Sequence, residues 1–307
     1  MKNINIKWIG AGSIVLAAVL WSLDALLRTK LYVLPPLTII FAEHAIGTLI
    51  AIPILIALRH KLKKLTQNQI VAVVIVSILS GILGTVLFTA ALQKLQFIPF
   101  SVVILLQQLQ PIFAITSSAI LLKEKISKQF IIYAVIALGG AYMLSFPELR
   151  VNLKTGEATA IAALMAVGAA ASWGSSTAIS KYALKGTYWL QITGIRFALA
   201  TMVSGIALLF IPSMNGLASV GSDQIKTLVL IAFSTGFVAL GIYYYGLQKV
   251  RASRATILEL AWPFTAVITG LLFFDKPLTI TQWIGALVLS TAAYMIARQE
   301  VTDTVKS

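Results

Sequence analysis

The stretch ALQKLQFIPFSVVILLQQLQPIFAITSSAILLKEKIS, residues 91–127, has a counterpart later in the chain. Residues 246–279, GLQKVRASRATILELAWPFTAVITGLLFFDKPLT, align with it when one gap of three residues and a second gap of one residue are allowed. A repeat of this length predicts that the chain contains two copies of one structural unit. The matched landmarks are Leu-Gln-Lys at 92–94 and 247–249, Pro111 and Pro263, and Glu124-Lys125 and Asp275-Lys276.

The repeat lies in a chain that is too apolar for an ordinary soluble domain. Of the 307 residues, 59% are apolar and only 11% are charged. Apolar runs of roughly 20 residues recur, and a helix of that length spans a hydrocarbon core about 30 Å thick. The runs lack the strict alternation of barrel strands, so we predict an all-α integral membrane protein in a lipid bilayer. Ten transmembrane helices are expected, near residues 8–28, 35–58, 69–92, 99–122, 128–146, 157–181, 188–211, 226–247, 254–274 and 280–298.

The two copies are predicted to have opposite orientations. Upstream of the repeat, VLWSLDA around Trp21 resembles ASWGSST around Trp173, each near the end of the first helix of its half. We therefore expect two five-helix repeats, residues 1–147 and 156–300, joined by the polar link PELRVNLKTGE. Because five is odd, the second repeat crosses the membrane in the sense opposite to the first. Such inverted repeats are common in secondary transporters, whose binding site lies near mid-membrane between the halves.

The basic residues of the chain are distributed unevenly. If the N-terminus is cytoplasmic, 16 Lys and Arg residues fall in inner segments and seven, Arg28 among them, in outer segments. This positive-inside bias explains the formal charge of +14 as membrane orientation, so no nucleic-acid partner is needed. We predict a multi-pass protein of the cell (inner) membrane with both termini cytoplasmic, and we also consider a homodimer.

Several classes of chemistry are excluded or disfavoured by composition. There is no Cys, which excludes disulfides, Cys-based metal sites and a Cys nucleophile. The two histidines, His44 and His60, are sixteen residues apart, which is not the spacing of a helical metal pair. No nucleotide-binding loop of the GxxxxGK[ST] type occurs, so an ion or substrate gradient would supply the energy. We expect no metal and no cofactor.

The repeated residues also carry a family resemblance. The Trp near each first-helix end, the Leu-Gln-Lys that closes a helix, the mid-helix Pro and the Glu/Asp-Lys after the fourth helix resemble the EamA-type members of the drug/metabolite transporter superfamily. The resemblance covers essentially the whole chain. It implies a carrier with a central cavity, often an exporter of amino acids or other small metabolites. One departure from the family pattern is in the second helix of the first half. It has AEHAIG, with Glu43 and His44, where the second half has IRFALA with the family-like Arg196.

Charged residues inside spans are the first functional candidates, because each costs at least about 2.5–3.5 kcal/mol in contact with lipid. Glu259 and Gln107 occupy matching positions, each four residues before the Pro of its repeat. The Pro removes one backbone hydrogen bond, which favours a kink beside these polar groups. We expect Glu259, with Trp262, to line a cavity wall, as Gln107 and Gln110 do in the first half. The alternative is that Glu259 reaches toward Arg254 or Arg251 at the membrane surface.

The adjacent residues Glu43 and His44 have two compatible interpretations. They form a titratable pair for proton coupling, or they pair structurally with Arg196 of the opposite half. Asp24 lies near the outer end of its helix, where a solvated terminus beside Arg28 is the favoured interpretation. With Glu259, these in-span residues leave a formal surplus of −2 if all ionise, which weakly favours a cationic or zwitterionic substrate or a coupling proton.

The aromatic candidates are Trp21, Trp173 and the run Tyr243–Tyr245, which could cage an apolar or cationic part of a ligand. Three consecutive Tyr cannot share one helix face, so at most two of them are expected in the cavity. The complete set of candidate substrate-binding residues is Glu259, Trp262, Gln107, Gln110, Arg196, Glu43, His44, Trp173, Tyr243 and Tyr244, with Glu43, His44, Glu259 and Asp24 as candidates for proton coupling.

The sequence therefore predicts a secondary active transporter rather than an enzyme. We expect efflux of amino acids or related amphipathic compounds by alternating access, with proton or exchange coupling. Its direction follows from the resemblance alone. Rival interpretations are a membrane-embedded enzyme acting on a lipid-linked substrate with His44 as base, an uptake carrier for a nucleotide-sugar-like or other metabolite, and a channel or scaffold.

Overall fold

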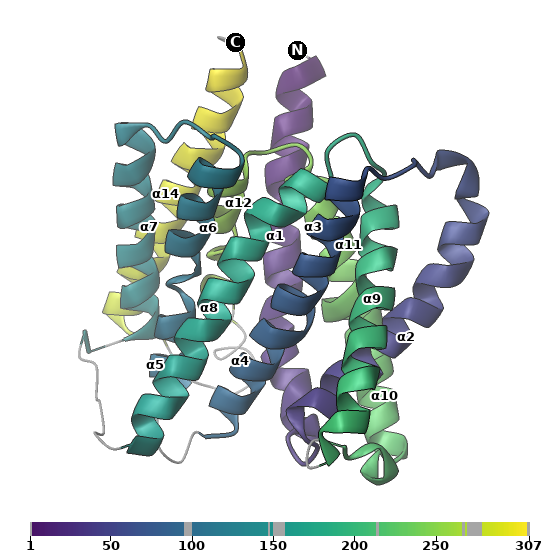
Figure 1. Cartoon of the computed structure of the whole chain (residues 1–307). Coiled ribbons are helices and arrows are strands. Elements are labelled where there is room, and N and C mark those ends of the chain that lie inside the picture. The colour runs from purple at the N-terminus through teal and green to yellow at the C-terminus, as the bar shows by residue number, and fades with distance from the viewer. Residues whose placement is uncertain are drawn as a thin grey trace.

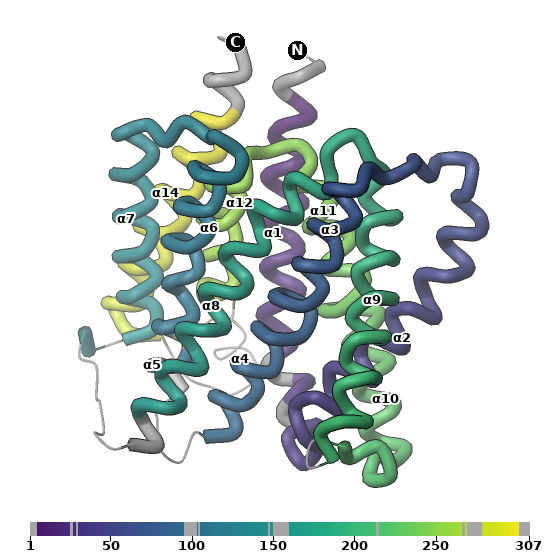
Figure 2. Tube along the Cα trace, viewed as in Figure 1, coloured from purple at the N-terminus to yellow at the C-terminus, as the bar shows by residue number. Residues whose placement is uncertain are grey.

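The fold is a bundle of helices, seen in a computed structural model that describes residues 2–94, 100–146, 148–149, 157–212, 215–265, 268 and 278–305 (Figures 1 and 2). All regular elements in these ranges are helical. They are α1 Lys2–Arg28, α2 Pro36–Ala57, α3 Gln67–Val76, α4 Gly84–Leu92, α5 Phe100–Gln107, α6 Gln110–Leu121, α7 Lys128–Ser145, α8 Glu157–Ala183, α9 Trp189–Phe210, α10 Ser222–Ile231, α11 Phe237–Leu247, α12 Ala252–Leu258 and α14 Ile280–Val305, with short turns of 3₁₀-helix between some of them.

Most of the predicted spans are present as long apolar helices. Eight helices of the described residues are long and apolar enough to cross a membrane, and Leu105–Leu121 is a shorter apolar helix. The last predicted span before α14, residues 254–274, begins within α12 and continues into residues outside the described ranges. The bundle is thus an all-α membrane protein. The count of ten spans stays a prediction.

Large apolar side chains cover the outside of the bundle. Leu209 and Phe210 of α9 are 76% and 81% exposed, and Ile280 and Leu287 of α14 are 79% and 70% exposed. Exposed apolar surface on this scale marks a membrane-facing or partner-facing surface. Together with the apolar length of the helices, it fits a multi-pass membrane protein.

Both termini lie at the same end of the bundle (Figure 1). The connections α2–α3, α6–α7, α8–α9 and α11–α12 are found at this end too. These connections carry the basic residues that the sequence assigned to the inner side. The positive-inside rule therefore favours a cytoplasmic location for this end.

Close helix pairs join the first half of the chain to the second. Extensive contacts are made by α2 with α9, by α7 with α14, by α1 with α11, and by α8 with α3, α4 and α6. Between α7 and α14 the backbones approach at Gly140 and Gly285, where a Cβ atom on Gly140 would lie 2.7 Å from the backbone nitrogen of Leu289. Glycine is required for such an approach, as is common where helices pack in membranes.

A π-helical segment interrupts the third helix of each half. One comprises Ser77–Leu83 between α3 and α4, and the other Ala232–Gly236 between α10 and α11. The offset of 155 residues that relates Leu92 to Leu247 also relates Ser77 to Ala232. Each segment therefore begins at an equivalent position of its repeat. Such π-bulges in α-helices are frequent at functional sites.

The Leu-Gln-Lys tripeptides have a structural explanation in their glutamines. Gln93 donates its side-chain amide to the carbonyls of Tyr32 and Leu34, at 3.3 and 3.2 Å, just after α1. Gln248 donates to the carbonyls of Leu184 and Thr187, both at 2.9 Å, just after α8. Each glutamine thus ties the third helix of a half to the end of the first helix, and α4 and α11 end at the tripeptides as predicted.

The helix is interrupted just before each repeated proline, where the sequence predicts a kink. Helix α5 ends at Gln107 and α6 begins at Gln110, with Pro111 in its first turn. In the second half α12 ends at Leu258, and two turn residues precede a further helical stretch that contains Pro263. The breaks place Gln107 and Glu259 where the helix is interrupted. The kinks predicted beside these polar groups take the form of helix interruptions.

The turn after the fourth helix of the first half is fixed by two helix caps. Ser127 caps α7 through the backbone nitrogen of Phe130, at 3.1 Å. The carboxylate of Glu124 accepts hydrogen bonds from the backbone nitrogens of Ala252 and Ser253, at 2.8 and 3.1 Å, and from the Ser253 hydroxyl. Glu124 of the first half therefore caps α12 of the second half.

Candidate functional site

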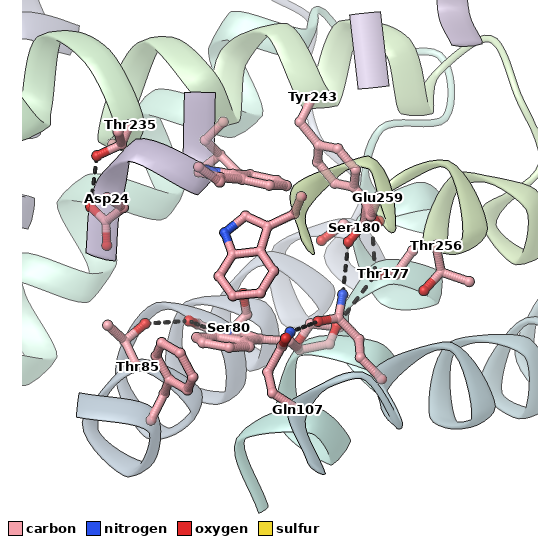
Figure 3. Close-up of a pocket in the computed structure, with 18 of the residues that line it drawn as sticks. Asp24, Ser80, Thr85, Gln107, Thr177, Ser180, Thr235, Tyr243, Thr256 and Glu259 are labelled. Carbon is pink, nitrogen blue, oxygen red and sulfur yellow. Dashed lines mark hydrogen bonds between the residues drawn. The ribbon is translucent and has the colours of Figure 1, made fainter. Parts of the chain in front are cut away.

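A cavity of about 240 Å³ lies between the two halves, beside the helix breaks (Figure 3). Its size is somewhat below the roughly 300–1,000 Å³ of typical small-molecule sites. Both halves contribute its walls. Every candidate residue from the sequence lines it: Asp24, Glu43, His44, Gln107, Gln110, Trp173, Arg196, Tyr243, Tyr244, Glu259 and Trp262.

Glu259 is held from two sides by neutral donors. The Tyr243 hydroxyl donates to one carboxylate oxygen at 2.6 Å, and the Gln110 amide donates to the other at 2.7 Å. Gln107 in turn donates its amide to the Gln110 oxygen at 2.9 Å. A chain of hydrogen bonds therefore runs from Gln107 of the first half to Glu259 and Tyr243 of the second, as Figure 3 shows for the labelled residues.

The carboxylate of Glu259 makes no ion pair within the described part of the chain. The interpretation that it reaches toward Arg254 or Arg251 is wrong. Arg254 donates to Glu300 of α14 at 2.7 Å, and the Arg251 guanidinium lies 3.8 Å from the same carboxylate. Glu259 instead faces the cavity, where hydrogen bonds from neutral groups stabilise its oxygens.

A second polar cluster lies around Arg28 on the same cavity. Arg28 is only 5% exposed and donates to Asp24 at 2.6 Å and to Glu43 at 3.0 Å. The Thr235 hydroxyl of the π-helical segment donates to Asp24 at 2.7 Å. The predicted contact between Asp24 and Arg28 is present, but it is part of a network that joins the first half to the second rather than a solvated terminus.

Two expectations about the charged residues are wrong. Glu43 pairs with Arg28, not with Arg196. Arg28 does not belong to an exposed outer segment, because it lies buried against the cavity. With the charge of Arg28 included, the formal net charge of the cavity changes from −2 to −1. Two cations, Arg28 and Arg196, then stand against three acids: Asp24, Glu43 and Glu259.

Arg196 is held by hydroxyl groups instead. It donates to the Tyr244 hydroxyl at 2.9 Å and to the Ser80 hydroxyl at 2.6 Å. Its neighbour His44 bonds to the Ile40 carbonyl through Nδ1 at 2.8 Å and packs its ring 4.9 Å from that of Phe197. One guanidinium nitrogen of Arg28 and one of Arg196 are enclosed without a hydrogen-bond partner in the described structure.

Aromatic rings form two walls that correspond through the repeat. Trp21 of α1 lies 5.1 Å from Tyr243 of α11, centroid to centroid, at an interplanar angle of 52°. Trp173 of α8 lies 5.2 Å from Phe88 of α4 at 59°. Tyr243 and Tyr244 line the cavity and Tyr245 does not, since three consecutive residues cannot share one helix face. The Tyr245 ring instead lies against Lys249, whose ammonium is 3.2 Å from the ring centre.

Sequence reasoning missed several residues of the site. Ser80 and Thr235 line the cavity because the π-helical segments present them there, and they are repeat equivalents at the offset of 155. Extending the repeat alignment upstream from Leu-Gln-Lys would have paired them, and would have paired Phe88 with Tyr243. Arg28 carried no sequence signal beyond its spacing of four from Asp24. Among the described residues, no group of three His, Cys, Asp or Glu side chains is placed to hold a metal ion.

The arrangement can bind a small ligand with mixed character. Aromatic rings offer flat apolar walls, amide and hydroxyl groups offer directional hydrogen bonds, and two arginines and three acids offer charge at defined places. A cavity with these features between two halves suits the binding of a small ligand.

Comparisons with known proteins agree with this description. The model of the EamA-like transporter family matches residues 8–146 and again residues 160–298. The chain is 30% identical over 294 residues to the protein named riboflavin transporter ImpX of Fusobacterium nucleatum, covering 94% of this chain and 97% of that protein. It is 29% identical to an uncharacterized transporter of Archaeoglobus fulgidus, covering 95% and 99%. A solved crystal structure that is 18% identical matches with a TM-score of 0.75 over 96% of this chain and 98% of its own.

Proposed function

The chain belongs to the EamA-like transporter family, and on that premise we propose that it carries a small polar metabolite across a membrane by binding it in the cavity between its halves. The observation that carries this proposal is the Glu259 carboxylate, which receives one hydrogen bond from its own half and one from Gln110 of the other. A ligand bound there contacts both halves at once. When the halves rock against each other, the same ligand is exposed to one side and then to the other.

We take a flat aromatic compound with polar edges, such as riboflavin, as the first candidate substrate. Two observations favour it: the relative named as a riboflavin transporter, and the two aromatic walls around Trp21 and Trp173. Amide and hydroxyl groups beside these walls match the carbonyl and imide edge of a flavin ring. The cavity of about 240 Å³ has to widen as the halves move to admit a ligand of this size.

An amino-acid-like substrate is the second candidate. It is favoured by the presence of Arg196 and Glu259 on one cavity, since a carboxylate and an amine find opposite charges there. Outward transport of such a compound is the expectation that the family resemblance gives. Competition between riboflavin and amino acids in one assay decides between the two candidates.

The proposal also covers the topology, the location, the energy source and the proton-coupling residues. The chain forms ten transmembrane helices as two inverted five-helix repeats, residues 1–147 and 156–300. It lies in the cell (inner) membrane with both termini cytoplasmic, and a pH gradient or exchange drives it. Glu259, Glu43, His44 and Asp24 are the candidates to carry the coupling proton. Glu259 is the first of these, because a carboxylate held by neutral donors has no fixed cation to lose when it takes a proton.

The test is transport by the purified chain in proteoliposomes. Vesicles are loaded with riboflavin or with pooled amino acids, and counterflow is measured with and without a pH gradient for wild type, Glu259→Gln and Asp223→Asn. Glutamine is the residue that the first half holds at the equivalent position, Gln107. Asp223 is the control because its side chain is 88% exposed and outside the cavity.

We expect saturable counterflow of riboflavin in wild type and in Asp223→Asn, and loss of the pH dependence in Glu259→Gln. Counterflow of amino acids without riboflavin would move the substrate to the second candidate. Unchanged pH dependence in Glu259→Gln would remove Glu259 from proton coupling. Flux that does not saturate would favour a channel, and chemical change of the loaded compound would favour an enzyme.

A further inference from the structure

The two cavity tryptophans are equivalent by repeat but differ in one hydrogen bond. The Trp173 indole donates its N–H to the Ser80 carbonyl at 3.2 Å. That carbonyl lies in the π-helical segment and also accepts the Thr85 hydroxyl at 3.2 Å. The Trp21 indole has no acceptor among the described residues, and its nitrogen is not among the unpartnered atoms enclosed by protein. Its N–H is therefore open to the cavity.

The difference is not caused by ring placement. The pairs Trp21–Tyr243 and Trp173–Phe88 have nearly the same centroid distance, 5.1 and 5.2 Å, and similar tilts of 52° and 59°. Each tryptophan thus packs in the same way on the third helix of the other half. The two tryptophans differ only in the hydrogen bond to the backbone, which Trp173 makes and Trp21 does not.

A glycine explains the asymmetry. A Cβ atom on Gly84 would lie 2.7 Å from the Trp173 indole nitrogen, so only glycine lets the indole reach the Ser80 carbonyl. The repeat equivalent of Gly84, at the offset of 155, is Ala239, and the equivalent of Thr85 is Leu240. Repeat equivalence puts the methyl group of Ala239 where Trp21 would have to approach the Thr235 carbonyl. No side chain of the described residues donates to that carbonyl.

Other donors on this wall of the cavity are already engaged. The Tyr243 hydroxyl donates to Glu259, and the Thr235 hydroxyl donates to Asp24. We propose that Trp21 is a specificity-determining residue, whose open indole N–H donates to an acceptor atom on an aromatic ligand, such as a ring carbonyl oxygen or ring nitrogen. Its equivalent Trp173 is a positioning residue whose N–H donates to the Ser80 carbonyl. The ligand part of this inference rests on the proposed function.

The first experiment needs no ligand. The chain has six Trp residues, so ¹⁵N-indole labelling of the purified protein gives six N–H signals, and Trp21→Phe and Trp173→Phe assign two of them. We expect the Trp21 signal to exchange with deuterium at least tenfold faster than the Trp173 signal. Equal rates, or slower exchange at Trp21, would overturn the inference even if riboflavin proves to be the wrong substrate.

The second experiment measures riboflavin binding by quenching of its fluorescence. Trp21→Phe keeps the ring but removes the donor, and we expect it to raise Kd about fivefold. Trp173→Phe removes the hydrogen bond to the Ser80 carbonyl and is expected to lower the unfolding temperature, whereas the exposed control Asp223→Asn is expected to change Kd less than twofold. An unchanged Kd in Trp21→Phe would overturn the assignment. If wild type does not bind riboflavin, the proposed substrate fails and the indole exchange rates decide the inference alone.

The sharpest variant lies outside the cavity. Ala239→Gly recreates the arrangement of the first half and should let the Trp21 indole reach the Thr235 carbonyl. We expect slowed exchange of the Trp21 N–H, an increase in Kd like that of Trp21→Phe, and no further increase when the two substitutions are combined. Ala91→Gly is the matched control, because Ala91 is equally buried in the first half and its equivalent, Gly246, is already glycine. If Ala91→Gly has the same effects, the role of Ala239 is refuted.

Discussion

Gln110 and Glu259 belong to different halves of the chain, and the amide nitrogen of Gln110 lies 2.7 Å from a carboxylate oxygen of Glu259. This hydrogen bond joins polar groups of the two halves directly beside the helix breaks. Because Glu259 finds no cation among the described residues, its oxygens depend on Gln110 and Tyr243 for stabilisation. The contact is therefore a place where stability and ligand binding are coupled.

The first prediction concerns this contact. Removing both partners should cost less than the sum of the single losses, because each single variant leaves one polar group unsatisfied. We expect a coupling free energy of about 1.5–3 kcal/mol between Gln110→Ala and Glu259→Ala. Denaturant unfolding of the four proteins of the cycle in mixed micelles measures it. Additivity within about 0.5 kcal/mol would contradict the contact.

The second prediction concerns Arg28, which alone among the described cations pairs with both Asp24 and Glu43. Arg28→Gln leaves two acids without their cation in a buried place, and the expected loss of unfolding free energy is about 3–5 kcal/mol. Adding Glu43→Gln to that variant should restore part of the stability, because one uncompensated charge is removed. A double variant less stable than Arg28→Gln would show that Glu43 is stabilised by other groups.

The third prediction concerns the cap that crosses between the halves. Glu124→Ala removes the acceptor of two backbone N–H groups at the start of α12, and we expect a loss of about 1–2 kcal/mol. Glu148→Ala is the control, since Glu148 is exposed. Thermal unfolding monitored by circular dichroism compares them. Equal unfolding temperatures for the two variants would show that the cap is not stabilising.

The fourth prediction concerns the two repeated glutamines. Gln93→Ala and Gln248→Ala each remove two hydrogen bonds to backbone carbonyls, so each should lower the unfolding free energy by about 1–3 kcal/mol. Their sites lie at the ends of different helices in different halves, so the losses should add within about 0.5 kcal/mol. Strong non-additivity in the same unfolding assay would mean that the two ends of the bundle do not respond independently.

Much of the architecture follows from the sequence because the membrane imposes length and polarity on each segment. The apolar runs located the long helices. The repeated prolines, Pro111 and Pro263, located the regions where the helices are interrupted, because Pro cannot donate a backbone hydrogen bond. The cost of burying charge in lipid pointed to three of the cavity residues, Glu43, Arg196 and Glu259. These are local rules, and one sequence is sufficient to apply them.

Contacts that depend on three-dimensional placement could not be derived in this way. Whether Glu43 meets Arg28 or Arg196 depends on how α2 lies against α1 and α9, and both partners have the right charge. The π-helical segments share no sequence signature at their first residue, because one begins with Ser77 and the other with Ala232. The inequality of Trp21 and Trp173 depends on one methyl group, that of Ala239, which becomes meaningful only when the neighbouring indole is in view.

The near-equivalence of the halves has an evolutionary and energetic consequence. A chain built from two identical inverted units would have the same energy open to either side, as would a dimer of a single five-helix ancestor inserted in both orientations. Under the alternating access that we propose, each position at which the copies have diverged, such as Gly84 and Ala239 or Gln107 and Glu259, makes the two open states unequal. Under that proposal, those positions are where a preference for one resting side would be set.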